Sequence, residues 1–221
     1  MKVLVACEES QRVCLAFRDK GHEAYSCDII ECSGGHPEYH IQEDVIKLVG
    51  GGENNHFITL DGTLHFVEKW DLIIAHPPCT YLSLAGNSWF NVERYGEKAI
   101  QRHKDREEAV KFFMYFTTIN CPRIAIENPI GTMSTRYKKP TQIIQPYQFG
   151  HAERKPTCLW LKGLPLLKPT NIVEPDIIYH KSGRTDSRWH WETFKLPKNE
   201  RAKIRSKTFE GIAKAMAEQW G

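Results

Sequence analysis

The sequence has no hydrophobic run long enough to cross a membrane. Its 221 residues are 41% hydrophobic, and the apolar stretches are short, whereas a membrane-spanning helix needs about 20 consecutive apolar residues. The first residues, Met1 to Ala6, are typical of a strand and are soon followed by Glu8 and Glu9, so we expect no signal peptide. These two absences predict a cytoplasmic protein.

The pattern of a disulfide framework is also missing. The seven cysteines are odd in number and irregularly spaced, which indicates reduced thiols in a reducing compartment. Cys27, Cys32, His36 and His40 lie close together, but they contain no tight Cys-x2-Cys pair of the kind that binds zinc. We therefore expect no metal site.

A large excess of charge of either sign is missing as well. The chain has 30 lysines and arginines against 27 acidic residues, and a net charge of +3 allows nucleic-acid binding without indicating it. Residues 181–207 differ, because nine basic residues there accompany only three acidic ones and alternate with Trp189, Trp191 and Phe194. Such side chains can neutralise phosphates and stack on bases. Residues 165–207 are thus either a short nucleic-acid-contacting segment or an ordinary solvated surface.

The chain lacks internal repeats, low-complexity tracts and a recognisable linker, which predicts one domain over residues 1–221. Short apolar runs alternate with helical patterns, as is typical of an α/β fold with a mostly parallel sheet and helices on both faces. Residues 50–70 surround an Asp61-Gly62 turn and predict a hairpin insertion. The predicted strands are 2–6, 24–27, 71–75, 124–126, 142–145 and 158–161, and the predicted helices are 10–20, 101–118 and 199–220.

One cysteine directly follows a predicted central strand. Residues 71–75 are a short apolar run with a leading acid, and a His-Pro-Pro-Cys motif occupies residues 76–79. Prolines cannot continue the hydrogen-bond ladder, so the chain turns out at the carboxyl edge of the sheet, where open α/β sheets carry their chemistry. Cys79 is therefore the candidate nucleophile, whereas the other six cysteines are typical of small buried residues.

Polar residues also follow two other predicted strands. Residues 124–126 lead into Glu127, Asn128 and Pro129, and polar groups at a buried strand end are costly unless they meet a ligand or each other. The second predicted strand ends at Asp28, about twenty residues after the first turn. An acid at that position accepts hydrogen bonds from ribose hydroxyls in nucleotide-binding folds.

Pro78-Cys79 after a strand, together with Glu127-Asn128-Pro129, resembles the two specific motifs of the cytosine-5 DNA methyltransferases. The resemblance is closest to short, divergent, phage-type members and spans most of the chain. It implies a Rossmann-like methyltransferase domain that uses S-adenosylmethionine. In such a domain Cys79 would attack carbon 6 of cytosine, Glu127 would hold and protonate the ring, and Asn128 would position Glu127.

A weaker match to the same family lies at residues 150–160. It implies that Arg154 contacts the target base, with Lys155 as the second choice. The same two side chains could instead pair with Glu153 or bind phosphate.

The resemblance also implies cofactor contacts from Cys7, Glu8, Asp28, Asp44 and Pro77. Glu8 would meet the methionine ammonium group, Asp28 the ribose and Asp44 the adenine. Asp44 fits equally well as the N-cap of a short helix over residues 45–49. The glycine-rich cofactor turn of the family is missing, and its place is taken by residues 6–10, which contain no glycine.

Two further departures concern the thiol and the substrate. His76 stands where relatives have glycine, and it could lower the pKa of the Cys79 thiol or perturb it by bulk. The chain also leaves little room for a large target-recognition domain. Its specificity is therefore either relaxed or supplied by an accessory subunit or a second copy in a homodimer.

The predicted function is methylation of carbon 5 of a flipped-out or single-stranded cytosine in DNA, in a bacterial cell or a phage-infected host. Protection of DNA from restriction is a plausible purpose. Two alternatives stay open: thiol-dependent modification of another pyrimidine, in RNA or a nucleotide, and a non-catalytic nucleic-acid-binding module. An amino-methyltransferase is disfavoured, because Cys79 occupies the place of the aromatic residue that follows Pro-Pro in those enzymes.

Overall fold

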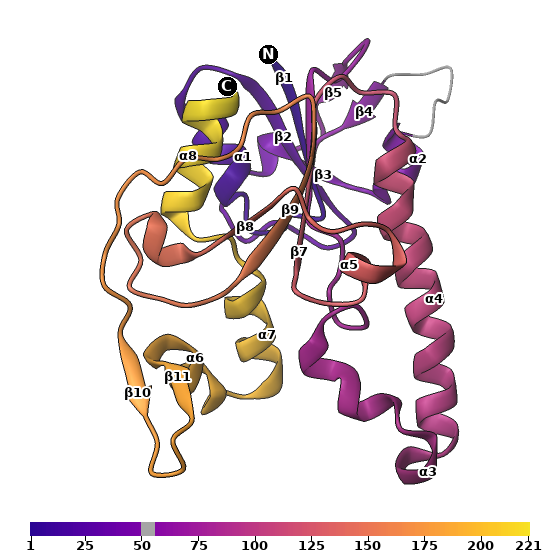
Figure 1. The fold of residues 1–221 in the computed structure, drawn as a ribbon. Helices are drawn as coiled ribbons and strands as arrows, with labels where there is room; N and C mark the ends of the chain where they lie inside the picture. The colour runs from indigo at the N-terminus through magenta and orange to yellow at the C-terminus, as the bar shows by residue number, and fades with distance from the viewer. Residues whose placement is uncertain (50–55) are drawn as a thin grey trace.

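The computed structural model describes residues 1–49 and 56–221, and a seven-stranded sheet forms its centre (Figure 1). The sheet strands are β1 (Lys2–Ala6), β2 (Glu23–Asp28), β3 (His40–Gln42), β6 (Leu72–Ala75), β7 (Ile124–Pro129), β8 (Gln142–Ile144) and β9 (Thr157–Lys162). Their spatial order is β3-β2-β1-β6-β7-β9-β8. The predicted strands are confirmed to within a few residues.

Strand direction identifies the fold class. The pairs β3–β2, β2–β1, β1–β6 and β6–β7 are parallel, whereas β9 runs antiparallel to both β7 and β8. One reversed strand inserted between β7 and β8 is the arrangement of Rossmann-like methyltransferase folds. The predicted α/β class, with a mostly parallel sheet and helices on both faces, is confirmed.

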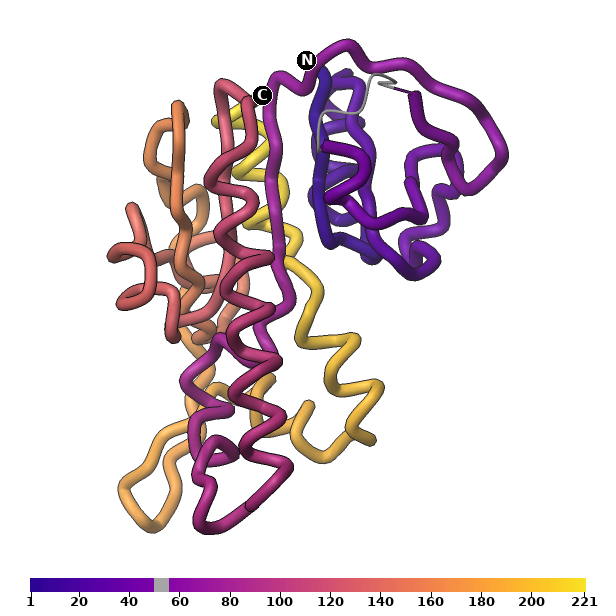
Figure 2. Tube along the Cα trace, turned by 90° about the vertical axis from the view of Figure 1, so that its right-hand side faces the viewer, coloured from indigo at the N-terminus to yellow at the C-terminus, as the bar shows by residue number. Residues whose placement is uncertain are grey.

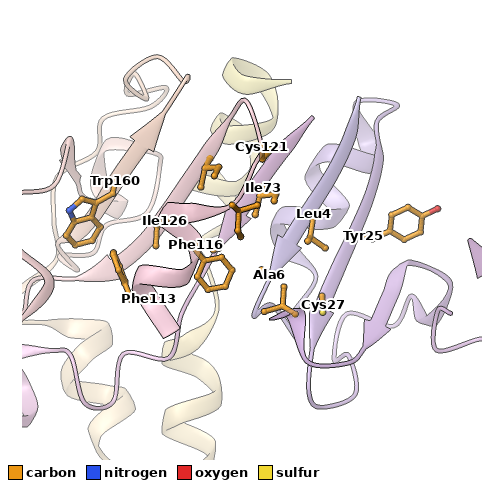
Figure 3. Packing of buried hydrophobic residues seen from close by; sticks show 14 of the residues in the cluster. Leu4, Ala6, Tyr25, Cys27, Ile73, Phe113, Phe116, Cys121, Ile126 and Trp160 are labelled. Carbon is orange, nitrogen blue, oxygen red and sulfur yellow. The ribbon is translucent and has the colours of Figure 1, made fainter. Parts of the chain in front are cut away.

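Alternation along the strands gives the sheet two apolar faces. Val3 and Val5 of β1 point toward α1 (Arg12–Asp19) and α8 (Glu210–Trp220), where Phe17 and Trp220 are buried. On the opposite face, Leu4, Ile73 and Ile126 belong to the same buried cluster as Phe113 and Phe116 of α4 (Glu97–Thr118) (Figure 3). Full burial of one such aromatic side chain stabilises the fold by about 1.5–3 kcal/mol.

The predicted final helix over 199–220 is wrong in one respect, because the structure divides it into α7 (Lys198–Ser206) and α8. Lys207 and Phe209 adopt extended backbone conformations between the two helices. At Gly211 a Cβ atom would lie 1.8 Å from the carbonyl oxygen of Phe149. The start of α8 therefore packs closely against the chain after β8. The extended residues before α8 allow α7 to run in a different direction from α8.

Two lobes extend beyond the carboxyl edge of the parallel strands, as both views show (Figures 1 and 2). The first, called the η2 lobe, contains η2 (Leu84–Phe90), α3 (Val92–Tyr95) and the start of α4. The second, called the C-terminal lobe, contains β10 (Ile177–Tyr179), β11 (Thr185–Ser187), α6 (Arg188–Phe194) and α7. Both lobes therefore lie on the side of the sheet where the parallel strands end.

The remaining elements surround the sheet. Gly62 takes a left-handed φ of 89° in the turn of an antiparallel hairpin, as the Asp-Gly turn requires, while residues 50–55 of the predicted insertion lie outside the described residues. Within the part of the chain that is described, no helix is long and apolar enough to span a membrane. The elements around the sheet that have not yet been named are β4 (His56–Ile58), β5 (Leu64–Phe66), α2 (Val45–Val49), α5 (Met133–Arg136), η1 (Pro37–Tyr39) and η3 (Pro146–Gln148).

Candidate active site

Strand register brings two titratable side chains together at the carboxyl edge. Ala75 of β6 is paired with both Ala6 of β1 and Ile126 of β7, so the residues that follow lie side by side. The Nδ1 atom of His76 lies 2.9 Å from Oε2 of Glu127, and both side chains are largely buried. This His76–Glu127 pair is the centre of the candidate site.

Cys79 lies in the tight turn that follows the two prolines. Its carbonyl oxygen accepts hydrogen bonds from the amides of Leu82 and Ser83, at 3.0 Å each. The residue is exposed, yet the protein atoms around its thiol exclude enough water to raise the thiol pKa, and the negative charge of Glu127 raises it further. The thiol is therefore mostly protonated at neutral pH and must lose its proton when it reacts.

Two arginines of α4 hold the backbone that follows Cys79. Arg102 donates to the carbonyl oxygen of Thr80, and Arg106 donates through Nε to that of Tyr81, each at 2.9 Å. The Arg106 guanidinium also lies 3.3 Å from the ring centroid of Phe90 in η2. The loop of Cys79 is thus attached to α4 by hydrogen bonds, and Arg106 of α4 in turn contacts Phe90 of the η2 lobe.

We expect Arg106→Met to release this loop and to make the Cys79 thiol more reactive. A looser loop admits water, so the thiol pKa falls toward its ordinary value, and each unit of decrease multiplies the thiolate fraction about tenfold. Alkylation of the Cys79 peptide by iodoacetamide at pH 8, followed by mass spectrometry, should accelerate about three- to tenfold. Lys111→Met on the same helix is the control, because Lys111 forms a salt bridge with Glu108 in which both side chains are exposed. Equal rates in the two variants would contradict a holding role for Arg106.

Glu8 is directed toward the first helix. Its two carboxylate oxygens accept hydrogen bonds from the amides of Val13 and Cys14, at 2.7 and 3.1 Å, in the first turn of α1. Burial raises the pKa of Glu8 to about 6, against the opposing charge of His76. The predicted ligand of a methionine ammonium group is therefore engaged with a helix terminus in this structure.

The turn between β1 and α1 uses left-handed conformations without glycine. Cys7 has a φ of 60° and Gln11 a φ of 59°, which are uncommon values for residues with a Cβ atom. The Gln11 side chain donates to the carbonyl oxygen of His36 at 2.8 Å and accepts from its amide at 3.1 Å. The cofactor turn predicted at residues 6–10 is thereby fixed against the loop that follows β2.

Two predicted cofactor acids lie near this turn. Asp28 ends β2, and its charge and that of Asp44 both raise the pKa of Cys7, although burial of the thiol is the larger cause. Oδ1 of Asp44 accepts from the amide of Ile46 at 3.0 Å, so Asp44 is the N-cap of α2, as the alternative interpretation predicts. The two acids and Cys7 therefore share one region of the carboxyl edge.

The residues around Asp28 fit the adenosine part of S-adenosylmethionine. Asp28 supplies a carboxylate suited to ribose hydroxyls, and the apolar side chains of Ile29 and Ile30 are 73% and 54% exposed directly beside it. Exposed apolar side chains beside an acid offer a flat purine a surface to cover. Asp28 also accepts from the amide of Ile30, which fixes the turn.

The basic residues before β9 separate into two roles. Arg154 donates to the hydroxyl of Thr185 in β11 at 3.0 Å. The charge of Lys155 instead lowers the pKa of both Cys79 and Glu127, and its Nζ donates to the carbonyl oxygen of Arg205 at 2.8 Å. Of the two candidates, Lys155 is therefore the one whose positive charge acts on Cys79 and Glu127.

Asn128 and Pro77 complete the strand ends. The Asn128 side chain is buried and donates to the carbonyl oxygen of Pro77 at 2.7 Å. Its Oδ1 atom has no hydrogen-bond partner within residues 1–49 and 56–221. Sequence reasoning did not include His76 among the site residues, although its place directly after a strand, level with Glu127, was a usable signal.

The basic and aromatic residues of the C-terminal lobe are only partly available to a ligand. Trp189 packs against Phe209 with ring centroids 5.2 Å apart, and Arg205 donates to the carbonyl oxygen of His190 and to Thr193. Phe194, by contrast, is 61% exposed. The described residues contain no cluster of histidine, cysteine and acidic side chains suited to a metal ion.

No family profile and no curated protein sequence matches this chain. One solved structure with a similar fold comes from E. coli and is described, provisionally, as a DNA modification methyltransferase encoded within a prophage. The two are 13% identical with a TM-score of 0.43, and the match covers 79% of this chain and 52% of that one, so this chain spans about half of its length. The fold assignment accordingly rests on the strand order and directions of this chain itself.

Proposed function

We propose that this protein transfers a methyl group to carbon 5 of cytosine in DNA through a covalent adduct between Cys79 and carbon 6. One observation carries the proposal: an exposed cysteine lies just after β6, and a largely buried carboxylate lies in the second half of the neighbouring strand β7, in a sheet with methyltransferase strand order. The motif resemblance adds the same assignment for Cys79 and Glu127.

The chemistry explains why both groups are needed. Carbon 5 of cytosine is a weak nucleophile, and addition of a thiolate at carbon 6 makes carbon 5 electron-rich. Negative charge then develops toward N3, where Glu127 would hold the ring and supply a proton. S-adenosylmethionine, when bound, supplies the methyl group. Lys155 favours the thiolate of Cys79 electrostatically, and Arg102 and Arg106 hold the turn that presents it.

DNA is the proposed substrate because two lobes that carry basic and aromatic side chains extend beyond the carboxyl edge, where the candidate site lies. Trp89 of the η2 lobe and Phe194 of the C-terminal lobe are 54% and 61% exposed. Exposed aromatic rings stack on unpaired bases in proteins that bind single strands. A cytosine must leave the duplex, or come from a single strand, to reach Cys79.

Binding of S-adenosylmethionine should depend on Asp28. We expect Asp28→Asn to weaken binding about 10- to 100-fold, because a hydrogen bond to a charged group contributes about 1.5–3 kcal/mol. Isothermal titration calorimetry measures the change, and Glu31→Gln, an exposed acid three residues further on, is the control. Unchanged affinity in Asp28→Asn would place the ribose elsewhere.

The proposal is tested by incubating the protein with S-adenosylmethionine carrying a labelled methyl group and with duplex DNA, heat-denatured DNA or RNA. Digestion to nucleosides and mass spectrometry then locate the label. We expect 5-methyldeoxycytidine from DNA. Label on an exocyclic amine would contradict the thiol mechanism, and label in RNA alone would favour another pyrimidine substrate.

A further inference from the structure

The partner of Glu127 in this structure is an imidazole. His76 and Glu127 side chains are only 11% and 20% exposed, and they share one hydrogen bond of 2.9 Å between Nδ1 and Oε2. The pairing follows from strand register, because the residues before them, Ala75 and Ile126, are paired across β6 and β7. The protonation of Glu127 is therefore coupled to that of His76.

Charged groups face His76 from three elements. Glu127 comes from β7, Glu8 from the turn between β1 and α1, and Lys155 from the segment before β9. Burial disfavours the charged imidazole, but the hydrogen bond and charge of Glu127 and the charge of Glu8 outweigh it, so the pKa of His76 is raised. Burial likewise opposes ionisation of Glu127, and the hydrogen bond and charge of His76 outweigh it, so its pKa is lowered.

Within the described residues, the imidazole of His76 has a hydrogen bond to Glu127 but none to Glu8. Glu8 is engaged with the amides of Val13 and Cys14, and Nε2 of His76 is buried without a hydrogen-bond partner in the described part of the chain. Among the described residues, Glu127 is thus the side chain to which the His76 imidazole can pass a proton along a hydrogen bond.

We propose that His76 stores the proton that Glu127 delivers to N3 of the cytosine when Cys79 attacks carbon 6. This assignment rests on the proposed function and deepens it. His76 does not touch the base; it acts through Glu127 and is a positioning and proton-storing residue. An ionised Glu127 alone has no proton to give, so the imidazolium behind it supplies what the reaction requires.

The proposed step balances as follows. The thiol proton of Cys79 leaves to solvent and the sulfur forms a bond to carbon 6. The electrons of the C5–C6 double bond move between C4 and C5, and those of the C4–N3 double bond move to N3. The proton on Nδ1 passes to Oε2 of Glu127 and from there to N3, which leaves His76 neutral. Carbon 5 would then take the methyl group as the bond between that methyl group and the donor sulfur breaks, which would leave the donor a neutral thioether. Carbon 5 loses its proton to solvent, the C5–C6 double bond re-forms and the C6–S bond breaks. The N3 proton returns to the pair, and the Cys79 thiolate takes a proton from solvent.

The pH dependence of turnover follows because the His76–Glu127 pair is active when it holds its proton. Turnover should fall as pH rises through the raised pKa of His76, because the pair then lacks the proton. In His76→Gln the amide still donates to Glu127 but stores no proton, so Glu127 must be protonated itself, and the decline at alkaline pH should begin at lower pH. A purely structural role would reduce turnover equally at every pH.

The kinetic test compares wild type, His76→Gln and His22→Gln in a methyl-transfer assay on cytosine-containing DNA between pH 5 and 9. His22 lies before β2, at the opposite end of the strands, and is the matched control. We expect His76→Gln to lower kcat about 10²-fold at pH 7.5, the scale for loss of an acid–base group, and to move the alkaline decline to lower pH. A wild-type pH profile in His76→Gln would overturn the inference. His76→Asn and thermal unfolding of each variant show whether a loss reflects misfolding.

A second measurement needs no turnover. Nitrogen-15 NMR of labelled histidines, with His76 assigned by His76→Gln, should show His76 charged to higher pH than an ordinary histidine and less so in Glu127→Gln. If methyl transfer is seen but His76 is neutral throughout pH 5–8, the proton-storing role is overturned and the proposed function stands. If wild type transfers no methyl group while His76 titrates as expected, the proposed function fails, and the proton store fails with it as a catalytic device.

Discussion

Cys79→Ser should abolish methyl transfer while the protein stays folded and still binds S-adenosylmethionine. A serine hydroxyl has nearly the same size, but it ionises far less readily and is a poor nucleophile for a pyrimidine ring. Loss of a covalent nucleophile lowers kcat by on the order of 10⁴-fold or more. Because Cys79 is exposed, the substitution leaves no cavity, and we expect little change in melting temperature.

The sharpest readout uses DNA that contains 5-fluorocytosine. Fluorine at carbon 5 cannot leave as a proton would, so the enzyme should remain covalently attached after methyl transfer and form an adduct that resists denaturation. Wild type should form this adduct and Cys79→Ser should not. Cys32→Ser is the matched control, since Cys32 is half-buried in the loop after β2. An adduct that persisted in Cys79→Ser would assign the nucleophile to another residue.

The strands of the fold were predictable because each central parallel strand is a short apolar run. Strand order was harder to predict, since the insertion of β9 between β7 and β8 depends on contacts between residues more than ten positions apart. The final helix shows the same limit. Helical spacing continues through residues 199–220, yet close approach of Gly211 to Phe149 requires the chain to break before α8.

The site shows which roles a sequence leaves open. Glu8 and Asp44 are acids after strands, and such acids can serve a ligand or a helix terminus. Both engage backbone amides at a helix start here, and only coordinates could reveal that. Asp28, by contrast, lies beside exposed apolar side chains, as a nucleoside-binding acid would.

The pairing of His76 with Glu127 could have been inferred from strand ends alone. It follows β6 immediately, and Glu127 lies level with it on β7. The different partners of Arg154 and Lys155 could not be inferred in this way, because adjacent residues before β9 differ only in the direction that each side chain takes. Positions directly after paired strands are therefore more predictable than positions in the irregular segments that approach them.

Glu127→Gln should separate two properties that most inactivating substitutions lower together. The amide keeps the size of the carboxylate and can still accept a hydrogen bond from His76, but it can neither carry a proton to N3 nor bear charge. Methyl transfer should therefore fall about 10²- to 10⁴-fold, the range for a general acid. At the same time the pKa of Cys79 should fall, because the negative charge of Glu127 is one of the causes that raise it.

The thiol of Glu127→Gln should accordingly react faster with iodoacetamide than the wild-type thiol at pH 7.5, although the variant is nearly inactive. Glu153→Gln is the comparison, because that acid lies two residues before Lys155 in the sequence but accepts a hydrogen bond from Ser187 of the C-terminal lobe. A variant that lost methyl transfer and thiol reactivity together would point to a displaced Cys79 loop. Faster alkylation with lost turnover would locate the defect in proton delivery to the base, the step that Glu127 and His76 are proposed to share.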